Sequence, residues 1–103
     1  MKAELYNRKY WIKGSDLSLF KHELESILTS CEFEILGFVD HQFSPQGYTS
    51  LWLLGESHLA LHTYPEHDLS YVELTSCSRS KNDLFEASLL KQFELIQSEK
   101  SVF

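Results

Sequence analysis

Residues 48–77 carry the sequence YTSLWLLGESHLALHTYPEHDLSYVELTSC, and this stretch decides the predicted fold. It holds three runs rich in β-forming residues, which we expect to be strands at residues 48–54, 58–64 and 69–77. Gly55 and Glu56 lie between the first and second runs, and Pro65 ends the second run. Strands in direct succession with such short turns favour a mostly antiparallel sheet.

On either side of this stretch the hydrophobic pattern changes to a helical period. Apolar residues recur at helical spacing from residue 16 to residue 31, which predicts an amphipathic helix there. Ser15, directly before it, is the expected N-cap. A second amphipathic helix is predicted over residues 83–97, with one apolar stripe formed by Phe85, Leu89, Phe93 and Ile96. Two further strands are expected at residues 5–13 and 33–40.

The predicted order is therefore strand, helix, four strands and helix. This order indicates an α+β fold, a two-layer α/β sandwich with a mostly antiparallel sheet and two helices on one face. The sequence ends soon after the second predicted helix, so no further strand is expected there.

The composition suits one small globular domain spanning residues 1–103. Hydrophobic residues make up 43% and charged residues 23% of the chain. The formal net charge of −6 argues against a nucleic-acid partner, which needs a basic surface to meet phosphates. The same charge is compatible with a cationic substrate.

Targeting signals and disulfides are not indicated. No apolar run approaches the roughly 20 residues that span a bilayer, and the first residues lack the apolar core of a secretory signal. The two cysteines, Cys31 and Cys77, do not form a disulfide framework. Cys31 lies on the apolar stripe of the first helix and is expected to be buried. We expect a cytoplasmic protein without a membrane partner.

The segment with chemical content is GESHLALHTYPE at residues 55–66, followed by Cys77 and preceded by HQFSP at residues 41–45. Across residues 41–77 these motifs resemble those of the S-adenosylmethionine decarboxylase proenzymes of the short bacterial and archaeal type. Those proteins share Glu-Ser-His, then His-Thr-aromatic-Pro-Glu, then a cysteine. One departure is Gly55, where the family usually has serine.

The resemblance implies that the chain cleaves itself between Glu56 and Ser57. The Ser57 hydroxyl would attack the Glu56 carbonyl in a strained turn, for which Gly55 is expected to provide the unusual backbone angles. His62 would then remove the Ser57 α-proton, since imidazole titrates near neutral pH. The products would be a β chain of residues 1–56 and an α chain of residues 57–103 that begins with a pyruvoyl group.

The same resemblance assigns the remaining site residues. The pyruvoyl ketone would form a Schiff base with the substrate amine and accept the electrons released as carbon dioxide leaves. Cys77 would protonate the resulting carbanion. Phe43 would stack on adenine, Glu66 would bind the ribose hydroxyls, and Thr49 would provide a hydroxyl near the pyruvoyl group. The family places this site at a homodimer interface.

Other chemical interpretations fit the residues less well. His58 and His62 form H-x-x-x-H, but in a strand residues four apart are separated by about 13 Å. A single zinc ion with bonds of about 2 Å cannot bind both, so no metal site is predicted. Residues 55–59 lack the second glycine of the G-x-S-x-G motif of serine hydrolases.

Two alternative functions remain open from the residues. One is a pyruvoyl-dependent decarboxylase of the same fold that acts on ornithine or arginine. The other is a non-catalytic paralogue that does not process itself and regulates a partner by forming a heterodimer, although the presence of Ser57, His62 and Cys77 together argues against it.

Overall fold

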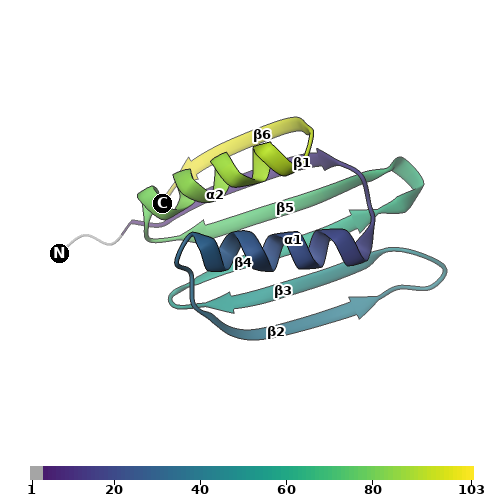
Figure 1. Cartoon of the computed structure of the whole chain (residues 1–103), viewed down its shortest axis with the longest axis horizontal. Helices are drawn as coiled ribbons and strands as arrows, with labels where there is room; N and C mark the ends of the chain where they lie inside the picture. Colours follow the sequence, from purple (N-terminus) through teal and green to yellow (C-terminus); the bar gives the residue numbers. More distant parts are fainter. Residues whose placement is uncertain (1–3) are drawn as a thin grey trace.

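The computed structural model describes residues 4–103. In it, six strands form one antiparallel sheet, and two α-helices cover one face of that sheet (Figure 1). The strands are β1 (Tyr6–Lys13), β2 (Ile35–Gln42), β3 (Tyr48–Leu54), β4 (Ser57–Tyr64), β5 (Leu69–Ser76) and β6 (Leu95–Val102). They lie in the order β2-β3-β4-β5-β1-β6. The helices are α1 (Leu17–Ser30) and α2 (Arg79–Gln92), and η1 (Pro65–His67) is a single 3-10 turn. The predicted fold class is confirmed.

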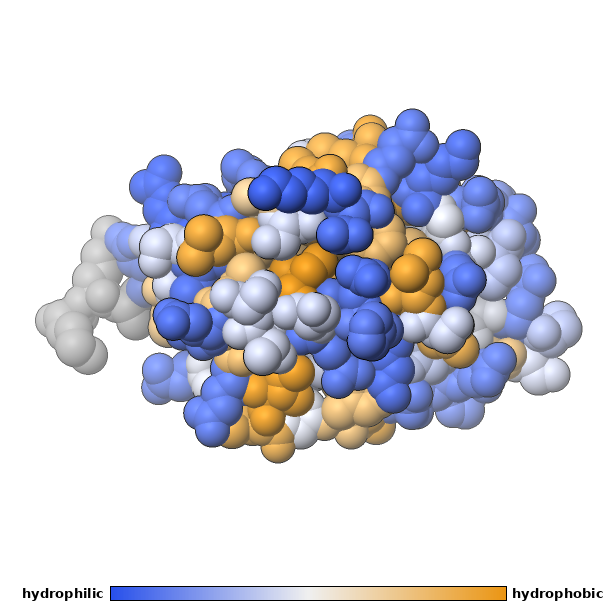
Figure 2. Space-filling view, in the orientation of Figure 1, coloured by the Kyte–Doolittle hydropathy of each residue, from blue (hydrophilic) through white to orange (hydrophobic). Residues whose placement is uncertain are grey.

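The hydrophobic core lies between the sheet and the helices. Burial alternates along β3 and β4, so every second side chain faces the helices. The largest fully buried side chains come from both layers: Trp52, Tyr10, Phe20, Phe85, Ile12, Leu24, Leu28, Leu54, Leu59, Leu61, Leu74 and Leu89. Figure 2 views the helical side, where hydrophobic residues appear in several separate areas among hydrophilic ones.

The first helix agrees with its prediction within one residue at each end. Asp16, not the expected Ser15, is its N-cap, and its side chain accepts a hydrogen bond of 3.2 Å from the Leu19 amide. Cys31 is buried as predicted, since only 2% of it is exposed. Its position beyond the last helical residue places the thiol against the core.

The second helix differs from its prediction at both ends. It begins at Arg79, because the Ser78 hydroxyl caps it by accepting a hydrogen bond of 3.2 Å from the Lys81 amide. It ends at Gln92, and residues 95–102 form the edge strand β6, paired with β1. The prediction of a helix through residue 97 with no strand after it was therefore wrong.

The opposite sheet face, which we call the open face, is left uncovered by α1 and α2. It carries the side chains of Trp11, Thr49, Leu51, Leu53, His58, Ala60, His62, Tyr64 and Tyr71, according to strand register and burial. Leu51 is 43% and Leu53 58% exposed there. Within residues 4–103, no helix has the length and apolar character needed to cross a membrane.

Candidate active site

The turn between β3 and β4 holds the predicted cleavage bond. Leu54 pairs with Ser57, so Gly55 and Glu56 alone form the connection. Glu56 has φ of 53°, a left-handed conformation that costs a residue with a side chain about 1 kcal/mol. Gly55 is not in the left-handed region, so the expectation that it provides the unusual angles was wrong. The strain lies at Glu56, on the acyl side of the Glu56–Ser57 bond.

Ser57 is buried, with 7% of its surface exposed, as the first residue of β4. It has the same strand parity as Leu59 and Leu61, which belong to the core beneath the helices. The turn residues before it, Gly55 and Glu56, are exposed. The bond in question thus joins an exposed turn to a buried strand start.

Cys77 lies at the same end of the sheet as Ser57. It follows the last residue of β5, and β5 runs antiparallel to β4 with His58 opposite Thr75. Continuing that register brings residue 77 beside the turn at residue 56. The Cys77 thiol is free and exposed, so a ligand can reach it.

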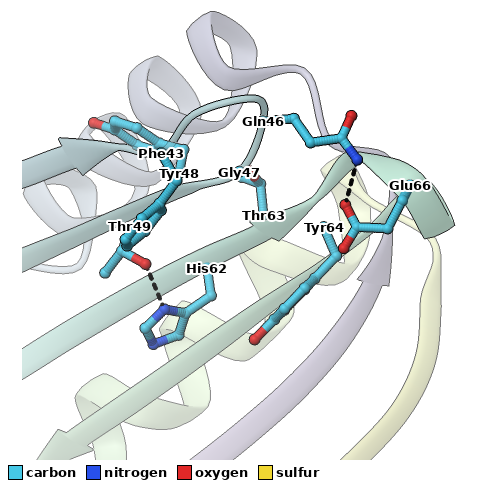
Figure 3. Close-up of a pocket in the computed structure, with 9 residues that line it drawn as sticks. All are labelled: Phe43, Gln46, Gly47, Tyr48, Thr49, His62, Thr63, Tyr64 and Glu66. Atoms are coloured by element: carbon cyan, nitrogen blue, oxygen red, sulfur yellow. Dashed lines mark hydrogen bonds between the residues drawn. The ribbon is translucent and has the colours of Figure 1, made fainter.

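His62 and Thr49 form a pair in the middle of the open face. They lie opposite each other in the β3–β4 register, and Thr49 Oγ1 is 2.8 Å from His62 Nδ1 (Figure 3). The imidazole stacks on the Tyr71 ring, with centroids 6.0 Å apart and an interplanar angle of 24°. Two neighbours on adjacent strands thus fix the plane and rotation of the imidazole.

Tyr71 is itself held in place by a carboxylate. Its hydroxyl donates a hydrogen bond of 2.6 Å to Glu73, and burial together with this bond raises the pKa of Tyr71. Burial opposes ionisation of Glu73, but hydrogen bonds from Tyr71 and Asn7 outweigh it and lower the pKa of Glu73. The tyrosine beneath His62 therefore stays protonated, beside an ionised glutamate.

A cavity of about 330 Å³ lies next to the His62–Thr49 pair. Its walls come from the β2–β3 loop, β3, β4 and η1, and its lining residues are Phe43, Gln46, Gly47, Tyr48, Thr49, His62, Thr63, Tyr64 and Glu66 (Figure 3). Phe43 packs edge-on against His41 with centroids 4.6 Å apart. The cavity thus brings an aromatic ring, a carboxylate, a hydroxyl and an imidazole together.

The predicted site residues therefore fall into two groups. Phe43, Thr49, His62 and Glu66 line the cavity, whereas Ser57 and Cys77 lie at the far end of β4 and β5. His62 lies five residues after Ser57 along extended strand, a span of about 16 Å. Within one chain, His62 does not reach Ser57.

Sequence reasoning missed two residues of this region. Gln46 lies outside the motifs named in the sequence, and Tyr71 lies in a predicted strand to which no role was assigned. The alternation of β5 could have placed Tyr71 on the same face as His62, but nothing in the sequence marks Gln46 as a contact of Glu66. Within residues 4–103, no three His, Cys, Asp or Glu side chains gather as a metal site would require.

A second, apolar hollow of about 400 Å³ lies near the β2 edge of the sheet. It is lined by Gly37, Phe38, Val39, Leu51, Trp52, Leu53 and His58. Val39 is 61% exposed, more than either leucine of the open face. Exposed aliphatic side chains that gather in this way are typical of a protein interface.

Comparison with protein families gives one match along nearly the whole chain. The model of a family described as S-adenosylmethionine decarboxylase matches residues 4–102. Among solved structures, the adenosylmethionine decarboxylase of Aquifex aeolicus superposes with a TM-score of 0.80, covering 100% of this chain and 91% of that one. At 24% sequence identity, this likeness shows the fold.

Curated relatives share the description "S-adenosylmethionine decarboxylase proenzyme". One from Prochlorococcus marinus (strain MIT 9313) is 40% identical over 89 residues, which are 86% of this chain and 70% of the relative. One from Brevibacillus brevis is 38% identical over 66 residues, which are 64% of this chain. The matched region spans 50% of the Brevibacillus relative's length and 60% of that of a Symbiobacterium thermophilum relative.

Proposed function

Because the chain belongs to the S-adenosylmethionine decarboxylase family, we propose that it is a proenzyme that cleaves itself between Glu56 and Ser57 and then decarboxylates S-adenosylmethionine. The observation that carries the proposal is the left-handed Glu56 in a two-residue turn directly before a buried serine. An ordinary peptide bond resists attack by a hydroxyl, and strain stored at this position lowers that resistance.

The self-cleavage follows from ordinary carbonyl chemistry. The Ser57 Oγ attacks the Glu56 carbonyl carbon, and the peptide C–N bond breaks to leave an ester and a free Ser57 amine. A base then removes the Ser57 α-proton while the Cβ–Oγ bond of Ser57 breaks, which releases residues 1–56 with a terminal carboxylate and leaves dehydroalanine at position 57. Water replaces the nitrogen of the dehydroalanine that remains, and ammonia leaves. Residue 57 becomes a pyruvoyl group at the start of the α chain.

His62 is the base that we propose for the proton removal. In this proposal the Nδ1–H of His62 donates the hydrogen bond to Thr49 Oγ1, so Nε2 carries the lone pair that takes the proton. The distance of about 16 Å along β4 excludes its own Ser57. We therefore propose that His62 acts on Ser57 of a second copy of the chain.

A homodimer formed through the open faces accounts for both groups of residues. A two-fold axis that lies between the two stacked sheets, over β4 near Ala60 and perpendicular to the strand, places the Ser57 end of one strand opposite the His62 end of the other. Stacked sheets lie about 10 Å apart, a gap that side chains from both copies span. The exposed Leu51 and Leu53 support this interface, because stacking would remove them from water.

The cavity beside His62 has the chemistry for the substrate's nucleoside part. In this proposal Phe43 stacks on adenine and Glu66 accepts hydrogen bonds from the ribose hydroxyls. The chain's net charge of −6 favours approach of a cationic sulfonium compound.

When formed, the pyruvoyl group supplies a ketone that withdraws electrons as carbon dioxide leaves. The exposed Cys77 delivers a proton to the substrate carbon, and the product supplies aminopropyl groups for spermidine synthesis.

Intact-protein mass spectrometry tests the cleavage directly. We expect two fragments, residues 1–56 and 57–103, with the second blocked at its amino end. Ser57→Ala should remain one full-length chain, and Ser26→Ala, an exposed serine on α1, should cleave like the parent. Carbon dioxide release is then measured with S-adenosylmethionine, ornithine and arginine. A parent chain that stays intact, or that decarboxylates only the amino acids, contradicts the proposal.

A further inference from the structure

The side chain of Gln46 joins the two segments that form the outer rim of the cavity. Its Nε2 donates a hydrogen bond of 3.0 Å to Oε2 of Glu66, across 20 residues of sequence (Figure 3). Gln46 comes from the loop between β2 and β3, and Glu66 from η1. Within residues 4–103, this is the hydrogen bond that holds the Glu66 carboxylate, since no other bond or ion pair of Glu66 is found there.

Both backbones are already fixed without this bond. The loop closes on itself through a hydrogen bond of 2.8 Å from the Phe43 amide to the Gly47 carbonyl, with Gly47 at φ of +103°. The η1 turn closes through a bond of 3.2 Å from the Asp68 amide to the Pro65 carbonyl. The Gln46–Glu66 bond is therefore not needed to form either turn, and what it fixes is the orientation of an exposed carboxylate.

The fixed orientation of the Glu66 carboxylate determines where its second oxygen, Oε1, points. With Oε2 occupied by the amide of Gln46, Oε1 remains open to accept a hydrogen bond from a ligand hydroxyl. A free glutamate side chain loses rotamer entropy when a ligand orders it. A glutamate that is held before the ligand arrives avoids most of that loss, so it binds and discriminates better.

We propose that Gln46 is a positioning residue for ribose recognition: it orients Glu66 so that the cavity selects nucleosides with an intact pair of ribose hydroxyls over their deoxy counterparts. This inference rests on the proposed function, because it assumes that the cavity takes the nucleoside part of the substrate. Gln46 itself need not touch the ligand. Its contribution passes through Glu66 alone.

The experiment measures binding rather than turnover, in a protein that cannot cleave itself. Ser57→Ala is the background, and the probes are 5′-methylthioadenosine and its 2′-deoxy and 3′-deoxy forms. Gln46→Met keeps the length of the side chain and removes the donor. Gln92→Met, at the exposed end of α2, is the matched control. Titration calorimetry gives each dissociation constant, and thermal unfolding checks that the variants fold.

We expect Gln46→Met to weaken binding of 5′-methylthioadenosine about fivefold, the size of one modest hydrogen bond. Binding of at least one deoxy form should change less, so that discrimination between ribose and deoxyribose falls. In a Glu66→Ala background, Gln46→Met should have no further effect, because its target is gone. Gln92→Met should match the parent throughout.

Two results overturn the inference, and they differ from failure of the proposed function. Equal losses for ribose and deoxyribose ligands mean that Gln46 shapes the cavity without orienting Glu66. An unchanged loss in the Glu66→Ala background means that it acts through another residue. If the parent binds none of the three nucleosides, the proposed substrate class fails and this inference fails with it. In the cleaved enzyme, Gln46→Met should raise KM and leave kcat unchanged.

Discussion

Two variants that cannot process themselves, Ser57→Ala and His62→Ala, should restore cleavage when they share a dimer. The first lacks the hydroxyl but keeps the base, and the second keeps the hydroxyl but lacks the base. In a mixed dimer the His62→Ala chain presents its Ser57 to the His62 of the other copy, so one of the two sites is complete. The second site lacks both the Ser57 hydroxyl and the His62 imidazole, so no cleavage occurs there.

The expected magnitude follows from the geometry. Proton transfer needs atoms about 3 Å apart, whereas Ser57 and His62 of one chain are separated by about 16 Å along β4. The strand cannot fold back to close this gap, because His62 is paired with Thr49 on one side and with Tyr71 on the other. A cis reaction is therefore absent, and a trans reaction proceeds at the rate of an intact site.

The assay is co-expression of the two chains with different affinity tags. Random pairing makes about half of the dimers mixed, so about half of the His62→Ala chains should be cleaved. Purification through both tags in turn should raise that share to nearly all of them. Intact-mass measurement distinguishes the two chains, and the Ser57→Ala chain should remain whole in every sample.

Two outcomes refute this reasoning. If doubly purified mixed dimers contain no cleaved chain while the parent cleaves, His62 acts on its own chain and the separation of the two groups does not hold in the maturing protein. If His62→Ala alone cleaves at the parent rate, another group removes the proton.

Three further predictions concern the sheet and its two faces. Leu53→Lys places a charge on the open face, so it should shift the protein to monomers in sedimentation and stop self-cleavage; a monomer that still cleaves contradicts the dimer proposal. Phe85→Ala removes a fully buried ring of α2 and should lower the free energy of unfolding in urea by about 3–5 kcal/mol, so a loss below about 1 kcal/mol would show that the ring packs loosely. Burial, and then the hydrogen bond to Asp40, raise the pKa of Tyr48 from 10.0 to about 12. The protonated Tyr48 therefore contributes its full share to the free energy of unfolding below pH 10, and this contribution is lost as the pH rises toward 12. Urea unfolding across this range should show a shallower loss for Tyr48→Phe than for the parent, and equal slopes would mean that Tyr48 is not responsible.

The strands were predictable because their hydrophobic pattern is forced by a one-sided core. Along β4, Leu59 and Leu61 must face the helices, so the alternation is visible in the sequence. The predicted strand boundaries agree with the structure to within two residues. Where a sheet face is buried against helices, the residue pattern carries nearly all of the information needed.

The edge strand β6 was not predictable by the same means. Most of its residues are exposed, so no buried stripe marks it as a strand. Ile96 stands three residues after Phe93, a spacing that continues the stripe of Phe85 and Leu89 and extends the predicted helix. What ends the helix at Gln92 is the pairing of residues 95–102 with β1, a long-range contact that local periodicity does not contain.

The site follows from the sequence in part, and the missing part has a physical cause. The chemistry of Ser57, His62 and Cys77 could be hypothesised from a motif, but a motif does not say which chain each group serves. Strand geometry adds that information, since His62 lies five residues after Ser57 along extended β4, about 16 Å away. Cys77 returns to the Ser57 end only because β5 runs antiparallel to β4. Ser57 and Cys77 therefore lie at one end of the sheet and His62 lies away from both. This arrangement suits a site in which His62 comes from a second copy of the chain. Under the proposed function, the chemistry therefore requires a dimer.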